Sequence, residues 1–202
     1  MHDPFLMKSI PDVFHDYIDK MQDVIGDGNY GFRAVAVSLG HSEDQWLYIR
    51  QQLLEELQSQ FYAYQQVFTD GFNEVYESLC WFESPAYLRH WMIMPLTGYL
   101  IANKFGVIVH CLSHEQSTTC FPLWRGPEEF QSHRNITVAL VGRHYFSVSL
   151  KGNYPMPPTT TYWNAHKSSS ASFWQTMYWS RFELYNQHRS RSSKISWIHI
   201  KD

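Results

Sequence analysis

The sequence predicts an α+β fold in which helices flank one small, mainly antiparallel β-sheet. Two observations predict it. Hydrophobic residues recur at helical spacing through much of residues 30–105, whereas residues 107–150 contain short β-branched and aromatic runs separated by turn residues. A chain that groups its helices and its strands in this way is typical of the α+β class.

The composition indicates one compact domain. The chain has 202 residues, of which 44% are hydrophobic, and this suffices for one core but would be cramped for two. Charged residues make up 17%, below the share of about a quarter in soluble proteins, so we expect some apolar surface to face a partner. The net charge of -3 gives no chain-wide attraction for nucleic acid or acidic membranes.

The cysteines and the apolar runs indicate a reducing compartment and no membrane span. Cys80, Cys111 and Cys120 are odd in number and form no C-x-x-C pair, which favours the cytoplasm or the nucleus. The first residues lack the continuous apolar segment of a secretory signal. The longest apolar run, residues 98–112, contains Lys104, so we expect nothing to cross a bilayer.

The first helix is expected after the turn "GDGN" at residues 26–29, where apolar residues then share one helix face: Phe32, Val35, Ala36 and Leu39. Ser42 and Gln45 have the form of a capping box, and a second helix is expected to follow it towards Phe68. Pro85 and Pro95 each stand where a first helical turn tolerates proline. The middle of the chain is therefore expected to be mostly helical.

The strands are expected at residues 107–112, 120–124, 135–141 and 144–150. The last two form a hairpin around a two-residue loop that begins with Gly142. Residues 153–163 are rich in proline and expected to be extended, a serine-rich hinge follows at 167–172, and a last amphipathic helix is expected to end near His188.

Two distant places combine into a candidate site. A cysteine hydrolase holds its nucleophile at a helix N-terminus, because the helix dipole and the free backbone N–H groups there favour a thiolate and bind a developing oxyanion. The turn at residues 26–29 supplies that geometry. His144 enters a strand from a tight turn, a position from which a histidine can act as general base.

The residues at both places resemble a known family. "GDGNYGFRA" at residues 26–34 resembles the nucleophile motif D-G-N-C-x-F-R of the ovarian-tumour (OTU) cysteine proteases, and "RHYFSVSL" at 143–150 resembles their terminal histidine strand. Residues 94–109, 121–124 and 154–163 are similar to OTU domains associated with transposable elements. The resemblance implies a papain-like OTU fold for residues 23–188, a helical extension at 1–22 and a tail at 189–202.

The resemblance also implies roles for single residues. His144 matches the general base, and Asp27 matches an acidic residue that some members use beside it. The other common position for that acid, two residues after the histidine, holds Phe146. Gly28 and Asn29 match the loop whose backbone forms the oxyanion hole. From the residues alone, Asp27 fits a turn or helix cap equally well, and His144 fits the end of a hairpin.

Tyr30 stands at the nucleophile position. The pKa of a phenol is about 10, whereas that of a thiol is about 8.5. The phenolic oxygen also lies several bonds further from the backbone than a cysteine sulfur, and the ring takes up space that the scissile carbonyl needs. We therefore expect a pseudo-deubiquitinase that needs no cofactor and that retains binding of ubiquitin or a ubiquitin-like tail.

Two alternatives stay open. The chain is an active OTU-type isopeptidase if Cys80, Cys111 or Cys120 replaces the missing nucleophile, or if it is a variant of an active parent. It is a non-catalytic docking domain of a transposon-encoded protein if ubiquitin plays no part. The acidic balance and the lack of a basic stripe make direct binding of nucleic acid unfavourable.

A zinc site and a substrate channel are two further hypotheses. His110, Cys111, His114 and Cys120 invite a zinc interpretation, but neighbouring residues of a strand point to opposite faces, so we expect no metal. Tyr145 and Trp163 are expected to line one wall of a channel that leads an extended, glycine-containing tail to His144.

Overall fold

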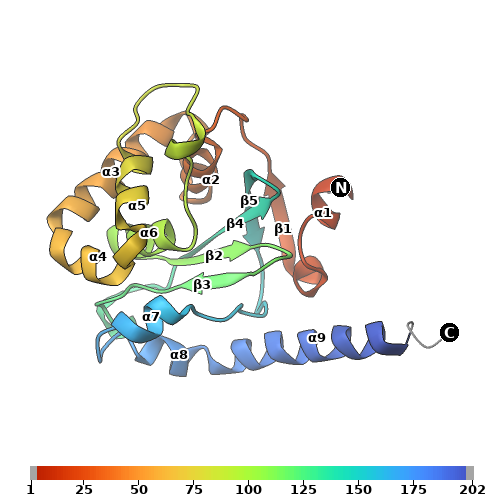
Figure 1. Ribbon diagram of the computed structural model, residues 1–202. Helices are drawn as coiled ribbons and strands as arrows, with labels where there is room; N and C mark the ends of the chain where they lie inside the picture. The colour runs from red at the N-terminus through yellow and green to blue at the C-terminus, as the bar shows by residue number, and fades with distance from the viewer. Residues whose placement is uncertain (1–3, 199–202) are drawn as a thin grey trace.

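The computed structural model of the protein describes residues 4–198, and within them the chain forms one five-stranded sheet with helices around it (Figure 1). This confirms the predicted α+β class. The strands lie in the order β1-β5-β4-β2-β3, and β2 and β4 run parallel while the other neighbours are antiparallel. Their bounds are β1 Ile18–Gln22, β2 Ile108–Leu112, β3 Thr118–Cys120, β4 Asn135–Val141 and β5 His144–Leu150.

The helices form two groups. Five lie on one side of the sheet: α2 Tyr30–Ser38, α3 Trp46–Ser59, α4 Phe61–Phe68, α5 Phe72–Leu79 and α6 Leu96–Phe105. The others are α1 Pro4–Lys8, α7 Thr161–His166, α8 Phe173–Met177 and the long α9 Trp179–Ile198, which runs along the lower side in Figure 1. Short 3-10 turns complete the chain: η1 Asp12–Tyr17, η2 Glu43–Gln45, η3 Thr69–Gly71, η4 Leu88–His90 and η5 Pro127–Glu129.

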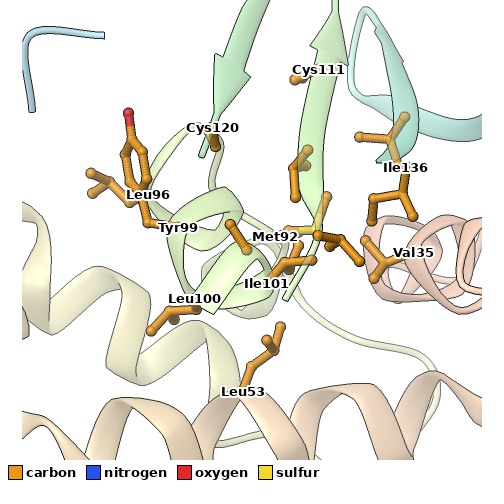
Figure 2. Close-up of a cluster of buried hydrophobic side chains, with 14 of the residues drawn as sticks. Val35, Leu53, Met92, Leu96, Tyr99, Leu100, Ile101, Cys111, Cys120 and Ile136 are labelled. Carbon is orange, nitrogen blue, oxygen red and sulfur yellow. The ribbon is translucent and has the colours of Figure 1, made fainter. Parts of the chain in front are cut away.

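The main core lies between the sheet and α2, α3 and α6. Figure 2 shows part of it, with Val35 of α2 beside Ile136 of β4, and with Leu53 of α3 below Leu100 of α6. The opposite face of the sheet has a smaller core that includes Phe14, Phe146 and Tyr185. Burial on both faces removes apolar surface from water and fixes the sheet relative to α2.

Several predicted elements are confirmed. The apolar face expected for α2 is buried, with Phe32 and Val35 fully inaccessible. Ser42 is an N-cap as expected, because its hydroxyl accepts a hydrogen bond from the Asp44 N–H at 3.3 Å, but the structure gives no reciprocal bond from Gln45 and α3 follows after one 3-10 turn. The β4–β5 hairpin turns at Gly142, whose φ of 59° is a left-handed conformation that suits glycine.

The ends of the chain differ from the prediction. Residues 1–22 were expected to be a helical extension, but β1 pairs with β5 and belongs to the sheet. Its charged residues Asp19 and Lys20 are exposed at the sheet edge, which hides the alternation of a strand. At the other end, α9 continues to Ile198, so residues 189–198 of the expected tail are helical.

Two local expectations also change. The strand expected at 120–124 ends at Cys120, because Pro122 has no N–H to donate to a ladder. Pro85 lies in a coil connection, whereas Pro95 directly precedes α6. Within residues 4–198, no helix combines the length and hydropathy needed to cross a bilayer.

Candidate functional site

The first residue of α2 and the first residue of β5 meet at the candidate site. The turn before α2 ends at Asn29, so Tyr30 opens the helix, and the β4–β5 hairpin places His144 at the start of its strand. The centroids of the Tyr30 and His144 rings lie 5.0 Å apart, with the ring planes tilted by 52°. The structure therefore brings together two of the residues that the sequence singles out.

His144 is held by a carboxylate that the sequence analysis did not identify. Its Nε2 lies 2.6 Å from Oδ1 of Asp23, the residue that follows β1. The same oxygen accepts the Val24 N–H at 2.8 Å, which fixes the carboxylate. An ionised Asp23 makes Nε2 the N–H donor, so Nδ1 is the nitrogen that can accept a proton. Nδ1 faces Gly26, where an added Cβ would lie 4.0 Å away.

Among the described residues, the carboxylate of Asp27 bonds to residues other than His144. Its carboxylate accepts hydrogen bonds from Arg33 Nη2 at 2.7 Å, from the Asn29 N–H at 2.9 Å and from the Ser84 hydroxyl at 2.6 Å. Burial alone would raise the pKa of Asp27, but the hydrogen bonds from Arg33, Ser84 and Asn29 outweigh it and hold the pKa well below its usual range. Asp27 thus organises the turn before α2.

The expected oxyanion loop is tightly built. Gly28 has a φ of 82°, and a Cβ there would lie 2.1 Å from the Ala86 carbonyl oxygen, so the position requires glycine. Asn29 is fully buried, and its Oδ1 accepts from Arg50 Nη2 at 2.8 Å. Because the Asn29 N–H already donates to Asp27, that backbone donor is occupied in this structure.

Tyr30, which the motif resemblance aligns with a nucleophile, has a buried ring. It is 5% exposed and also contacts Trp91 and Tyr145, with ring centroids at 5.2 and 6.2 Å. Its hydroxyl is buried and has no hydrogen-bond partner among the described residues. Burial raises the pKa of Tyr30 well above its usual value, although the nearby charge of Arg143 acts in the opposite direction. A neutral phenol with no base on its proton is a poor nucleophile.

The cysteines do not show the environment of a reactive thiol. Cys111 and Cys120 are buried, whereas Cys80 is exposed at the end of α5. Burial raises the pKa of all three thiols, to about 12 for Cys111. A catalytic cysteine needs the opposite shift, because the thiolate is the reactive form.

The two residues expected to line a channel are mostly inaccessible. Tyr145 is 4% exposed and contacts the Tyr30 ring. Trp163 is fully buried, its indole N–H donates to the Pro122 carbonyl at 3.2 Å, and its ring packs against Phe121. The first turn of α7 directs Trp163 into the core, so the expectation of a channel wall at this residue does not match its position.

The four residues considered for zinc are engaged in other contacts. His110 is fully buried, with Nδ1 3.0 Å from the Thr119 hydroxyl and Nε2 2.9 Å from the Tyr154 hydroxyl. Its burial, with a smaller effect of Arg181, lowers its pKa to about 3. His114 Nε2 lies 3.0 Å from the Lys8 carbonyl. In the part of the chain that the structure describes, no group of three or more potential ligands could hold a metal ion.

Comparison with known proteins gives structural likeness at low identity. No family model and no curated protein matches the sequence. The chain is similar to the OTU domain of OTUD1, with a TM-score of 0.47 and 16% identity over 64% of this chain and 84% of that one. Viral OTU domain proteases from Dera Ghazi Khan virus and Farallon virus give TM-scores of 0.49 and 0.47, at 15% and 14% identity. Each alignment covers 69% of this chain, and 85% and 88% of the viral chains respectively. These identities are too low to transfer residue roles.

Proposed function

We propose that this protein is an OTU-like pseudo-deubiquitinase, which binds ubiquitin or a ubiquitin-like tail and does not cleave it. One observation carries the proposal: Tyr30 occupies the start of α2 directly against His144, in a sequence motif that resembles the nucleophile motif of OTU proteases. The Asp23 carboxylate orients the imidazole of His144, but the side chain next to that imidazole has no reactive sulfur.

The buried state of Tyr30 makes direct use of its oxygen unfavourable. Attack on an amide carbonyl needs an ionised or base-activated nucleophile, and the raised pKa of this phenol opposes ionisation. The ring also packs between Trp91, Tyr145 and His144, so it takes up the volume that a scissile carbonyl would require. Loss of cleavage therefore needs no further change in the fold.

The activity part of the proposal is tested by restoring the sulfur. Tyr30→Cys is expected to gain ubiquitin-chain cleavage, whereas the unaltered protein shows none above background. Tyr30→Ala leaves a similar cavity without a thiol and serves as the matched control, and Tyr30→Cys with His144→Ala should lose the gained activity. Replacing a buried aromatic ring costs about 3–5 kcal/mol, so unfolding curves of all variants accompany the assay. Cleavage by the unaltered protein at a rate like that of Tyr30→Cys contradicts the proposal.

The binding part of the proposal has a separate test. Labelled protein is titrated with unlabelled ubiquitin and followed by NMR. Shifts clustered around His144 and the turn at residues 26–29 support tail binding at this site. Silence at millimolar ubiquitin contradicts it and favours the alternative of a docking domain for another partner. Reaction of a ubiquitin-tail electrophile at Cys80, Cys111 or Cys120, mapped by mass spectrometry, would instead favour an active enzyme.

A further inference from the structure

A coil segment from the connection between α5 and α6 covers the turn that precedes α2. This segment, residues 83–92, is called the strap and contains η4; it belongs to the connection between α5 and α6 in Figure 1. Its Ala86 N–H donates to the Asp27 carbonyl at 2.8 Å, and its Glu83 carbonyl accepts from Asn29 Nδ2 at 3.3 Å. The strap is therefore bonded to the loop that leads into the candidate site.

The strap also closes over the aromatic side chain at the site. The Trp91 ring meets the Tyr30 ring edge-on, with centroids 5.2 Å apart, and the Trp91 indole N–H donates to the Ala86 carbonyl at 3.2 Å. Met92 packs so closely on Gly31 that a Cβ there would lie 2.5 Å from the Met92 Cβ. Access to Tyr30 from this side requires the strap to move.

Ser84 forms a side-chain bond that holds the strap to the turn. Ser84 is exposed, and its hydroxyl donates a hydrogen bond to Asp27 Oδ2 at 2.6 Å. The surroundings are rich in negative charge, because Arg33 contacts three carboxylates, with nitrogen–oxygen distances of 2.7, 4.0 and 3.6 Å to Asp27, Glu43 and Asp44. One guanidinium therefore already serves three anionic groups, and it has little capacity left for a fourth.

We propose that the Ser84 hydroxyl holds the strap closed through its bond to Asp27, and that phosphorylation of this exposed serine opens the strap. The phosphate ester cannot donate the bond to Asp27, and it adds a charge of about −1.5 to −2 at a position next to that carboxylate. In the transfer from a nucleoside triphosphate, the Ser84 Oγ–phosphorus bond forms and the phosphorus–bridging oxygen bond breaks. The hydroxyl proton passes to the base of the kinase, and the nucleoside diphosphate leaves.

Opening of the strap exposes the site near Tyr30. Any effect of this movement on tail binding rests on the proposed function, but the movement itself does not. The experiment therefore uses hydrogen exchange and no ubiquitin. If the strap opens as expected and ubiquitin still causes no NMR shifts, the proposed function fails while the inference about Ser84 stands.

The test compares amide exchange in the unaltered protein, in protein carrying phosphoserine at position 84, and in three variants. The Ala86 amide reports on the strap, and amides of β4 report on global stability. Phosphorylation is expected to speed exchange at Ala86 at least tenfold with β4 unchanged, and Ser84→Glu is expected to act in the same direction. Ser84→Thr keeps the hydroxyl and should behave like the unaltered protein. Leu88→Glu adds the same single negative charge as Ser84→Glu, but at another exposed residue of the strap, and should leave exchange at Ala86 unchanged.

Three results would overturn the inference. Unchanged exchange at Ala86 in the phosphorylated protein shows that Ser84 does not hold the strap. Equal acceleration in Leu88→Glu shows that any added charge loosens this segment. Acceleration in β4 together with the strap shows that the bond to Asp27 supports the whole fold and does not control one segment.

Discussion

His144 Nε2 and Asp23 Oδ1 lie 2.6 Å apart, although 121 positions separate the two residues in the chain. The contact arises because β1 pairs with β5, so the residue after the end of β1 lies beside the residue that begins β5. A carboxylate in this position fixes the orientation of the imidazole and stabilises its protonated form during proton transfer. Asp23 is thus the acidic partner that the geometry supplies.

Asp23 is predicted to position His144 in the variant Tyr30→Cys, which the proposed function expects to cleave ubiquitin chains. Asp23→Ala in that background should lower kcat for ubiquitin-chain cleavage about 10²-fold or more, because the imidazole loses its fixed orientation, while KM changes little. Asp19→Ala removes an exposed carboxylate of β1 and is the control. Equal kcat in Tyr30→Cys with and without Asp23→Ala would show that His144 needs no acidic partner.

Asp27, in contrast to Asp23, is predicted to contribute to the stability of the fold. Its carboxylate and the Arg33 guanidinium are both largely buried, with 11% and 6% of their side chains exposed. Asp27→Asn removes the shortest ion pair of Arg33 and leaves its guanidinium with Glu43 and Asp44 at 4.0 and 3.6 Å. The variant should therefore lower the free energy of unfolding by about 2 kcal/mol at pH 7. Urea unfolding measures the loss, and Asp19→Asn should change stability by less than about 0.5 kcal/mol.

The same carboxylate predicts a pH dependence at acidic pH. The pKa of Asp27 in the fold is lower than its unfolded value of about 4, so its contribution is complete above pH 4. The contribution is lost as the pH falls towards the folded-state pKa, because protonation then favours the unfolded chain. The stability difference between the unaltered protein and Asp27→Asn should therefore shrink below pH 4. A difference that stays constant down to pH 2.5 would contradict the assignment.

Local patterns predicted the elements whose signals are local. The spacing of Phe32 and Val35 predicted the buried face of α2, and the glycine at position 142 predicted the hairpin that presents His144. β1 was not predicted, because the exposed charges of Asp19 and Lys20 break the alternation of a half-buried strand. Without β1, the sequence contains no signal that Asp23 lies beside the histidine, because that contact depends on strand pairing.

The partners of the Asp27 side chain were not predicted for a different reason. Its main partner, Arg33, is only six residues away, so the local motif contained both members of the ion pair. The bonds from Ser84 and Ala86 come from a coil segment with no hydrophobic period, and sequence patterns do not indicate where such a segment lies. The packing of Trp163 into the core was also not predicted, because it depends on how α7 packs against Phe121, which local sequence patterns do not indicate.

The buried hydroxyl of Tyr30 predicts a gain in stability when it is removed. An unpartnered polar group in the core costs about 1–3 kcal/mol, so Tyr30→Phe should raise the free energy of unfolding by about 1 kcal/mol. Tyr64 is the matched control, because its buried hydroxyl donates to Glu56 at 2.8 Å and accepts from Asn103 at 2.6 Å. Tyr64→Phe should lower stability by about 1–2 kcal/mol. A loss of stability in both variants would show that the Tyr30 hydroxyl has a partner.

His110 predicts a second pH dependence, in a higher range. The Thr119 hydroxyl donates to the Pro157 carbonyl at 2.7 Å, so it accepts from Nδ1–H, and Nε2 accepts from the Tyr154 hydroxyl. The neutral imidazole therefore satisfies both neighbours. Its pKa is about 3 in the fold and about 6.5 in the unfolded chain, so its neutral form stabilises the protein fully above pH 6.5.

That contribution is expected to fall by about 1.4 kcal/mol for each pH unit as the pH decreases from 6.5 towards 3, because only the unfolded chain takes up the proton. Urea unfolding between pH 7.5 and 4.5 measures how the free energy of unfolding changes with pH. His110→Gln should reduce this slope by the equivalent of about one proton, whereas His41→Gln, at an exposed position, should leave the slope as it is in the unaltered protein. Nitrogen chemical shifts of the His110 ring at pH 5 provide a check that needs no variant. A ring with both nitrogens protonated at that pH would contradict the neutral, doubly bonded imidazole on which the slope depends.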